Sequence, residues 1–167
     1  MKCMGAAQAL IFRSSVLQLF ILALAGGVMG TVLGYFSQLG LAWHFDFPTR
    51  RGLEATPIVV DGIMFTTGAW SQVYALNAST GEEIWRYDPE VLARLRDKKH
   101  LRFNWGTNRG VAYWKGRVYV ASYDGRLIAL DATTGKETWS VQTFDPDEPR
   151  YITGAPRVFN DLVLIGH

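Results

Sequence analysis

The sequence predicts an all-β chain made of four-stranded antiparallel β-propeller blades that form an incomplete ring. Two observations predict this fold class. First, a segment that reads as short strands and tight turns recurs along the chain. Second, the 167 residues of the chain include 17 Gly, 6 Trp and 7 Tyr. Many glycines together with many aromatic residues are typical of short strands joined by tight turns.

The repeat has the pattern Ala-x-(Asn or Asp)-x-x-Thr-Gly-x-x-x-Trp, which occurs at 75–85 and again at 129–139. The alignment extends upstream without a gap and places Glu54 on Asn108, and a third copy begins at Thr153. A period of about 45 residues is typical of propeller blades. We therefore expect a partial propeller over 37–167, with complete blades at about 52–87 and 108–142 and partial blades at both ends.

Each copy divides into four strands by its turn signals, such as Asp61-Gly62 between the first two. Trp85 and Trp139 end the two copies and are expected to be buried between blades, where a large aromatic side chain buries most area. The expected strands are 58–60, 63–67, 73–76 and 84–87 in the first copy, and 111–114, 117–122, 127–130 and 138–141 in the second.

One helix is expected outside the leader, over 89–102. Asp88 precedes it as a possible N-cap, and Pro89 would occupy the first turn. Because the segment carries Lys98, Lys99 and Arg102, we expect a solvated insertion between two blades.

Composition excludes several classes of protein. Hydrophobic residues make up 49% of the chain and charged residues 19%, which excludes a disordered chain. The net charge of +2 and the lack of long basic runs argue against binding of nucleic acid. The single cysteine, Cys3, excludes an internal disulfide.

The first 36 residues read as a leader with an apolar helix. No Asp, Glu, Lys or Arg lies between Arg13 and Asp46, and the apolar stretch at 16–36 is long enough to cross a bilayer. Lys2, Arg13 and the small residues around Ala25 also fit a cleaved signal peptide. A signal peptide and a membrane anchor would both send the domain out of the cytoplasm; an artefact of how the chain was cut or fused is the third explanation.

Polar residues stand just before the first strand of each copy, at Glu54, Asn108 and Thr153. The first strand of a blade lines the central axis of a propeller, so these side chains would meet at one mouth of the channel. Arg109 is the only cation among them. Such a set could hold a planar polyanion. Alternatively, Glu54 and Arg109 form an ion pair between blades and Thr153 caps a strand.

The repeat resembles the tryptophan-docking motif of quinoprotein propellers. Together with the strings at 51–57, 108–114, 124–132 and 152–157, it is similar to the N-terminal blades of alcohol dehydrogenases that depend on pyrroloquinoline quinone (PQQ), the methanol and ethanol dehydrogenase family. The resemblance implies an eight-bladed periplasmic enzyme that oxidises a primary alcohol with PQQ and calcium and passes electrons to cytochrome c or a quinone. It assigns PQQ contacts to Glu54, Arg109 and Thr153.

The resemblance also implies that the calcium ligands and the aspartate base lie beyond this chain, so no catalytic or metal-ligating residue is assigned here. Where many relatives carry two adjacent cysteines, this sequence has Phe103 and Asn104, and Phe103 or Trp105 could stack on a ring or pack against 89–102. The acidic loop at 145–149 is a weak calcium candidate without a ligand ladder. His44, His100 and His167 show no zinc spacing.

Two other functions fit the repeats. One is a non-enzymatic propeller scaffold of the kind that assists outer-membrane protein assembly, although Cys3 precedes the apolar stretch and is no lipoprotein cysteine. The other is a gene remnant without function.

Overall fold

The computed structural model describes residues 26–28, 43–96 and 106–166. The chain divides into two units, Met1–Ala42 and Trp43–His167. In the first unit only residues 26–28 are described; they are helical and exposed. Within the described residues, no helix has the length and apolar character needed to span a membrane. The predicted leader at 1–36, with its apolar stretch at 16–36, falls almost entirely outside the described residues and stays a prediction.

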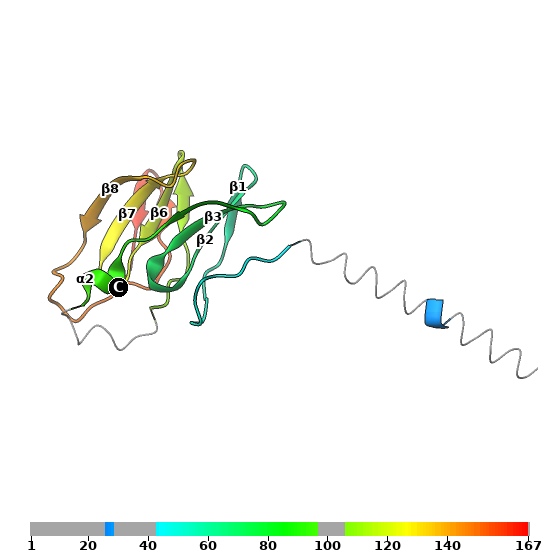
Figure 1. Ribbon diagram of the computed structural model, residues 1–167. Helices are drawn as coiled ribbons and strands as arrows, with labels where there is room; N and C mark the ends of the chain where they lie inside the picture. The colour runs from blue at the N-terminus through cyan, green and yellow to red at the C-terminus, as the bar shows by residue number, and fades with distance from the viewer. Residues whose placement is uncertain (1–25, 29–42, 97–105, 167) are drawn as a thin grey trace, which may run out of the picture. The chain divides into compact units, whose positions relative to one another are not determined.

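The second unit consists of consecutive antiparallel sheets (Figure 1). The first sheet has the order β1-β2-β3-β4 and the second the order β5-β6-β7-β8, while β9 and β10 form a two-stranded sheet. This architecture confirms the predicted fold class. The strands are β1 Ile58–Val60, β2 Ile63–Thr67, β3 Val73–Asn77, β4 Glu83–Tyr87, β5 Ala112–Trp114, β6 Arg117–Ala121, β7 Arg126–Asp131, β8 Glu137–Gln142, β9 Arg157–Phe159 and β10 Leu162–Leu164.

The first hairpin of each sheet turns through two residues with positive φ. Asp61 and Gly62 have φ of 50° and 78°, and Lys115 and Gly116 have φ of 47° and 76°. Two left-handed residues in a row make the turn whose twist matches that of the flanking strands. The turns lie where the sequence predicts them, and the observed strands begin and end within about one residue of the predicted ones.

The predicted helix over 89–102 is wrong in extent and surroundings where the structure describes it. Helix α2 is one turn, Val91–Arg94, and Asp88 is not its N-cap: the Asp88 carboxylate accepts a hydrogen bond from the Glu90 N–H instead. Val91 and Leu95 are buried against Tyr123, so this part of the insertion is packed, not solvated. Packing stabilises this turn, because a helix of one turn is not stable in isolation.

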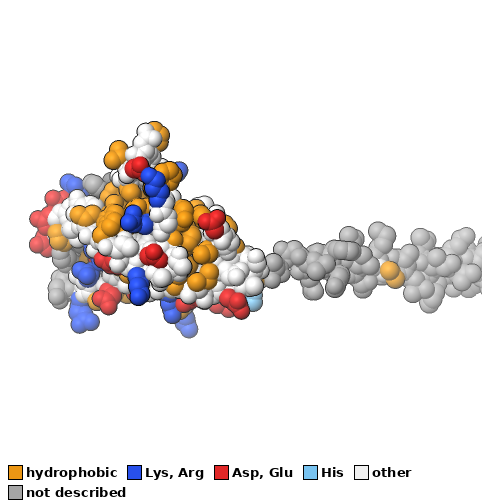
Figure 2. All heavy atoms as spheres, turned by 90° about the horizontal axis from the view of Figure 1, so that it is seen from above, with side chains coloured by type: hydrophobic (Ala, Val, Ile, Leu, Met, Phe, Trp, Pro, Cys, Tyr) orange, Lys and Arg blue, Asp and Glu red, His pale blue; other side chains and the backbone are white. Residues whose placement is uncertain are grey.

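The main core lies between the two four-stranded sheets. Phe65, Val73 and Trp85 of the first sheet pack with Val118 and Ile128 of the second, all of them buried. Figure 2 shows hydrophobic side chains on one outer face as well, between scattered charges of both signs. The core is thus an interface between blades, so neither sheet buries its apolar face alone.

Indole rings join the sheets at a fixed point. Trp85 Nε1 donates to the Ala132 carbonyl at 3.0 Å, and the ring lies over Gly135, whose φ is 70°. Trp43 makes the same contact one blade earlier, with its Nε1 3.0 Å from the Ala78 carbonyl. The glycine leaves room for the ring, because a Cβ at Gly135 would lie 2.6 Å from it.

Trp139 occupies the equivalent position on β8 but is 39% exposed, so the expectation that it is buried is wrong. The third sheet has only β9 and β10 within the described residues. Phe159 and Leu162 on these strands are also exposed. A docking indole is buried by the turn of the following blade, and the described residues contain no such turn for Trp139.

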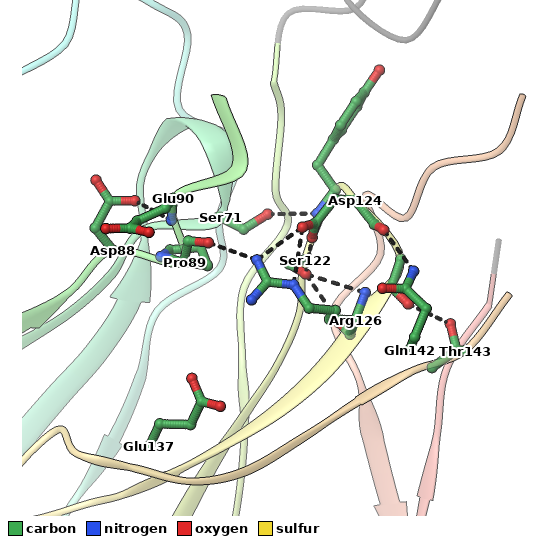
Figure 3. Close-up of polar contacts among 12 residues, drawn as sticks. Ser71, Asp88, Pro89, Glu90, Ser122, Asp124, Arg126, Glu137, Gln142 and Thr143 are labelled. Atoms are coloured by element: carbon green, nitrogen blue, oxygen red, sulfur yellow. Dashed lines mark hydrogen bonds and ion pairs between the residues drawn. The ribbon is translucent and has the colours of Figure 1, made fainter. Parts of the chain in front are cut away.

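A buried polar network ties the insertion to the second blade (Figure 3). The Arg126 guanidinium pairs with Asp124 at 2.8 Å, with both side chains less than 10% exposed, and donates to the Pro89 carbonyl at 2.6 Å. The Ser122 hydroxyl donates to Asp124, and Gln142 donates to the Asp124 carbonyl. A buried ion pair persists only when further hydrogen bonds satisfy both partners, and this network supplies them.

Gly135→Ala tests the indole contact, with Gly116→Ala as the matched control. Both glycines have φ between 70° and 76°, but a Cβ at Gly116 would meet nothing within 4 Å. Left-handed strain should lower the free energy of unfolding by about 1–2 kcal/mol in both variants. Displacement of the indole should add about 1–3 kcal/mol in Gly135→Ala alone. Equal losses in urea unfolding would contradict the contact.

Asp124→Asn tests the buried pair. It leaves the Arg126 charge buried without its partner, so we expect a loss of about 3–5 kcal/mol in the free energy of unfolding. Glu148→Gln removes the partner of Arg150 from a pair in which both side chains are more than 40% exposed, and should change stability little. Chemical denaturation of both variants compares them, and similar losses would contradict the role given to the pair.

Candidate functional site

The three residues that the sequence singles out lie together. Arg109 Nη2 is 3.3 Å from Glu54 Oε2, and Arg109 Nη1 donates to the Thr153 hydroxyl at 2.5 Å. Each residue comes from a different copy of the repeat. Arg109 therefore bridges a carboxylate and a hydroxyl that are far apart in the chain.

The backbone brings these residues together. Each stands a few residues before an inner strand: Glu54 before β1, Arg109 before β5 and Thr153 before β9. The Thr56 N–H donates to the Arg109 carbonyl at 3.2 Å, and the Arg109 N–H donates to the Thr153 carbonyl at 2.9 Å. The three segments thus run side by side at one end of the inner strands.

The site is open to a ligand. The side chains of Arg109 and Glu54 are 54% and 53% exposed. Arg109 also lines a groove of about 880 Å³ along the inner strands, whose walls include Val111, Tyr113 and Val158. An exposed ion pair contributes only about 0–1 kcal/mol to stability, so stability alone is a weak reason for this arrangement. A guanidinium has N–H donors beyond the two used here and could bind an anionic ligand at the same time.

Asn108 does not join this group, although the repeat aligns it with Glu54. It is 2% exposed, and its amide donates to the Ala121 carbonyl at 2.9 Å and to the Ser71 hydroxyl at 3.2 Å. The expectation that its side chain faces the channel mouth is wrong. The reason is that buried acceptors on β6 and in the preceding blade lie within reach of an amide donor.

Sequence reasoning missed an aromatic cluster next to these segments. Tyr123 is stacked on Tyr151, with centroids 5.0 Å apart, and meets the edge of Trp70. Arg51 lies over the Trp70 ring at 5.0 Å. Burial, above all, raises the pKa of Tyr123 to about 12, so its hydroxyl stays protonated. No repeat signal marks the cluster, because Trp70 and Tyr123 do not align with each other.

The other candidates from the sequence are the acidic loop, possible metal ligands and the aromatic residues near Asn104. The acidic loop at 145–149 is a local turn in which the Asp145 carboxylate accepts from the Asp147 N–H and Glu148 pairs with Arg150. The described ranges contain no group of three His, Cys, Asp or Glu side chains that could hold a metal. Phe103, Asn104 and Trp105 lie outside the described residues, so stacking of these side chains on a ring stays a prediction.

A β-propeller with a bridged arginine at the start of its inner strands is the class of protein that fold and site define. The family model described as "Glucose/ethanol/alcohol dehydrogenase, beta-propeller domain", abbreviated PQQ, matches residues 35–151. The chain belongs to this PQQ-dependent quinoprotein alcohol dehydrogenase family.

Individual relatives support this family membership. The chain is 54% identical over 130 residues to quinohemoprotein alcohol dehydrogenase ADH IIB of Pseudomonas putida, covering 78% of this chain and 18% of the relative. It is 50% identical over 131 residues to 1-butanol dehydrogenase (cytochrome c) of Thauera butanivorans, with the same shares covered. The crystal structure of quinohemoprotein alcohol dehydrogenase from Comamonas testosteroni superposes with a TM-score of 0.69 at 51% identity, over 75% of this chain and 18% of that one. The chain thus spans about 18% of the length of these relatives.

Proposed function

We propose that this chain supplies part of the PQQ-binding wall of a periplasmic alcohol dehydrogenase, through Glu54, Arg109 and Thr153. The observation that carries the proposal is the bridge that Arg109 makes to a carboxylate and a hydroxyl from the two neighbouring repeats. Family membership adds the chemistry of the ligand, since PQQ is a planar molecule that carries carboxylates and quinone carbonyls.

The donor set fits such a molecule. A guanidinium donates to carboxylate or carbonyl oxygens in its own plane, and charge-assisted bonds of this kind are about twice as strong as neutral ones. The Thr153 hydroxyl can donate or accept, and the Glu54 carboxylate forms an ion pair with Arg109. When bound, PQQ supplies the oxidising power for removal of two electrons from an alcohol.

In this proposal, the residues of this chain bind the cofactor and orient it. The positive charge of Arg109 favours an anionic ligand, and the hydrogen bonds between the segments that carry Arg109 and Thr153 fix the spacing of the donors. The apolar part of the groove, with Val111 and Val158, would exclude water from one side of a planar ring. We assign no proton transfer to the described residues.

The metal, the catalytic base and the electron acceptor are proposed from membership of the family. Calcium ligands and the aspartate that acts as base are assigned to residues beyond this chain, and cytochrome c or a quinone is the proposed electron acceptor. The Thauera relative is a 1-butanol dehydrogenase (cytochrome c) by name, which supports a primary alcohol as substrate here. The leader at 16–36 is proposed to export the protein or to anchor it in the inner membrane.

Arg109→Lys tests the site. Lysine keeps the charge but cannot bridge two partners in a plane, so the Kd for PQQ of the intact protein should rise about 10–100-fold. Arg86→Lys is the control, since Arg86 is also a half-exposed arginine paired with a glutamate, but it lies on the outer strand β4 and does not line the groove. Titration followed by protein fluorescence gives both values. An intact protein that does not bind PQQ would favour the non-enzymatic scaffold.

The 167-residue chain by itself is expected to show no turnover, because the proposed base and metal ligands lie outside it. The measurement is dye reduction with PQQ, calcium and a primary alcohol. Alcohol-dependent reduction of the dye by this polypeptide would show that the assignment of the base is wrong.

A further inference from the structure

Ser71 occupies a strained position between the blades. It is 0% exposed and ends the 3-10 turn η1, Ala69–Ser71, between β2 and β3. Trp70 and Ser71 have φ of 60° and 64° in succession, although neither is glycine. Non-glycine residues in this region are held there by their surroundings, and such strain gathers at functional sites.

The surroundings of Ser71 belong to the other blade. Its Oγ accepts a hydrogen bond from Asn108 Nδ2 at 3.2 Å and from the Tyr123 N–H at 2.9 Å. Figure 3 shows the hydroxyl directed at the β6–β7 turn. One hydroxyl of the first blade therefore satisfies two buried donors of the second.

Asn108 connects this contact to the segment that carries the site. Its Oδ1 accepts from the Gly110 N–H at 3.0 Å, and its carbonyl accepts from the Thr67 hydroxyl at 3.4 Å. The Asn108 amide thereby closes a turn around Arg109 while both blades hold it. Gly110 is required in this turn, since its φ is 125° and a Cβ would lie 3.0 Å from the Thr56 carbonyl oxygen.

The backbone of Arg109 is held in place, whereas the end of its side chain is exposed. Asn108 and Gly110 hold the backbone on either side of it, whereas the long side chain is 54% exposed and meets only exposed or half-buried partners. A side chain that must be ordered on binding lowers affinity, and a preorganised one raises it.

We propose that Ser71 and Asn108 are positioning residues that hold the backbone of Arg109 for PQQ binding; this inference rests on the proposed function of the site. Neither residue faces the groove, so both act through Arg109. The left-handed turn at 70–71 brings the Ser71 hydroxyl to Asn108.

The experiment compares Ser71→Gly and Ser71→Ala in the intact protein. Both remove the hydroxyl, but glycine also relieves the strain at φ of 64°. We expect the Kd for PQQ to rise about tenfold in both variants, with a Tm near that of the wild type only for Ser71→Gly. Ser122→Ala is the matched control: Ser122 is also a buried serine, bonded to Asp124 and Arg126 and not to Asn108. It should lower Tm and leave the Kd unchanged.

The outcomes separate this inference from the proposed function. If Arg109→Lys weakens PQQ binding while Ser71→Gly binds like the wild type, the site stands and the inference fails. Equal weakening by Ser71→Gly and Ser122→Ala also overturns it, because a general loss of packing would then explain the effect. If the wild type does not bind PQQ, the proposed function itself fails and the inference falls with it.

Discussion

The packing of each four-stranded sheet against the next is the constraint on which the rest of the structure depends. A sheet with two apolar faces is stable only when neighbours cover both. Here the main core lies between β1–β4 and β5–β8, and the docked indoles of Trp43 and Trp85 fix the spacing at the outer strands. A glycine with positive φ under each ring lets the contact close.

The same packing places the candidate site. Once the sheets are stacked, the segments that lead into β1, β5 and β9 run next to one another and exchange backbone hydrogen bonds. Glu54, Arg109 and Thr153 then meet without any direct link in sequence. The site is thus a consequence of blade stacking, and Ser71, which joins the blades without lining the groove, is proposed to support it through Asn108.

Burial divides the polar residues of this end into two groups. Asn108 and Ser71 are buried, have all their partners inside the protein and serve as fixed supports. Arg109 and Glu54 are about half exposed, and their pair adds little to stability. Rigid supporting residues beneath exposed charged side chains suit a binding site. The supporting residues are already ordered when the protein has folded, and the charges remain accessible to a ligand.

The sequence alone determined the repeat, the strands and the turns, because these depend on local signals: glycine-containing turns such as Asp61-Gly62, and a Trp at a constant place in each copy. It also picked out Glu54 and Thr153, since the repeat aligns the starts of the inner strands, and Arg109 as the only cation among them, one residue after the aligned Asn108. Only the tertiary structure decided that Asn108 turns inward where Glu54 does not, that Ser71 links the blades, that the 89–102 segment begins as a single packed helical turn, and that Trp139 is partly exposed. For Asn108, Ser71 and the start of the 89–102 segment, the partners come from a neighbouring blade, whereas for Trp139 the described residues contain no turn of a following blade. Repeat alignment compares positions along the chain without showing what lies across from them.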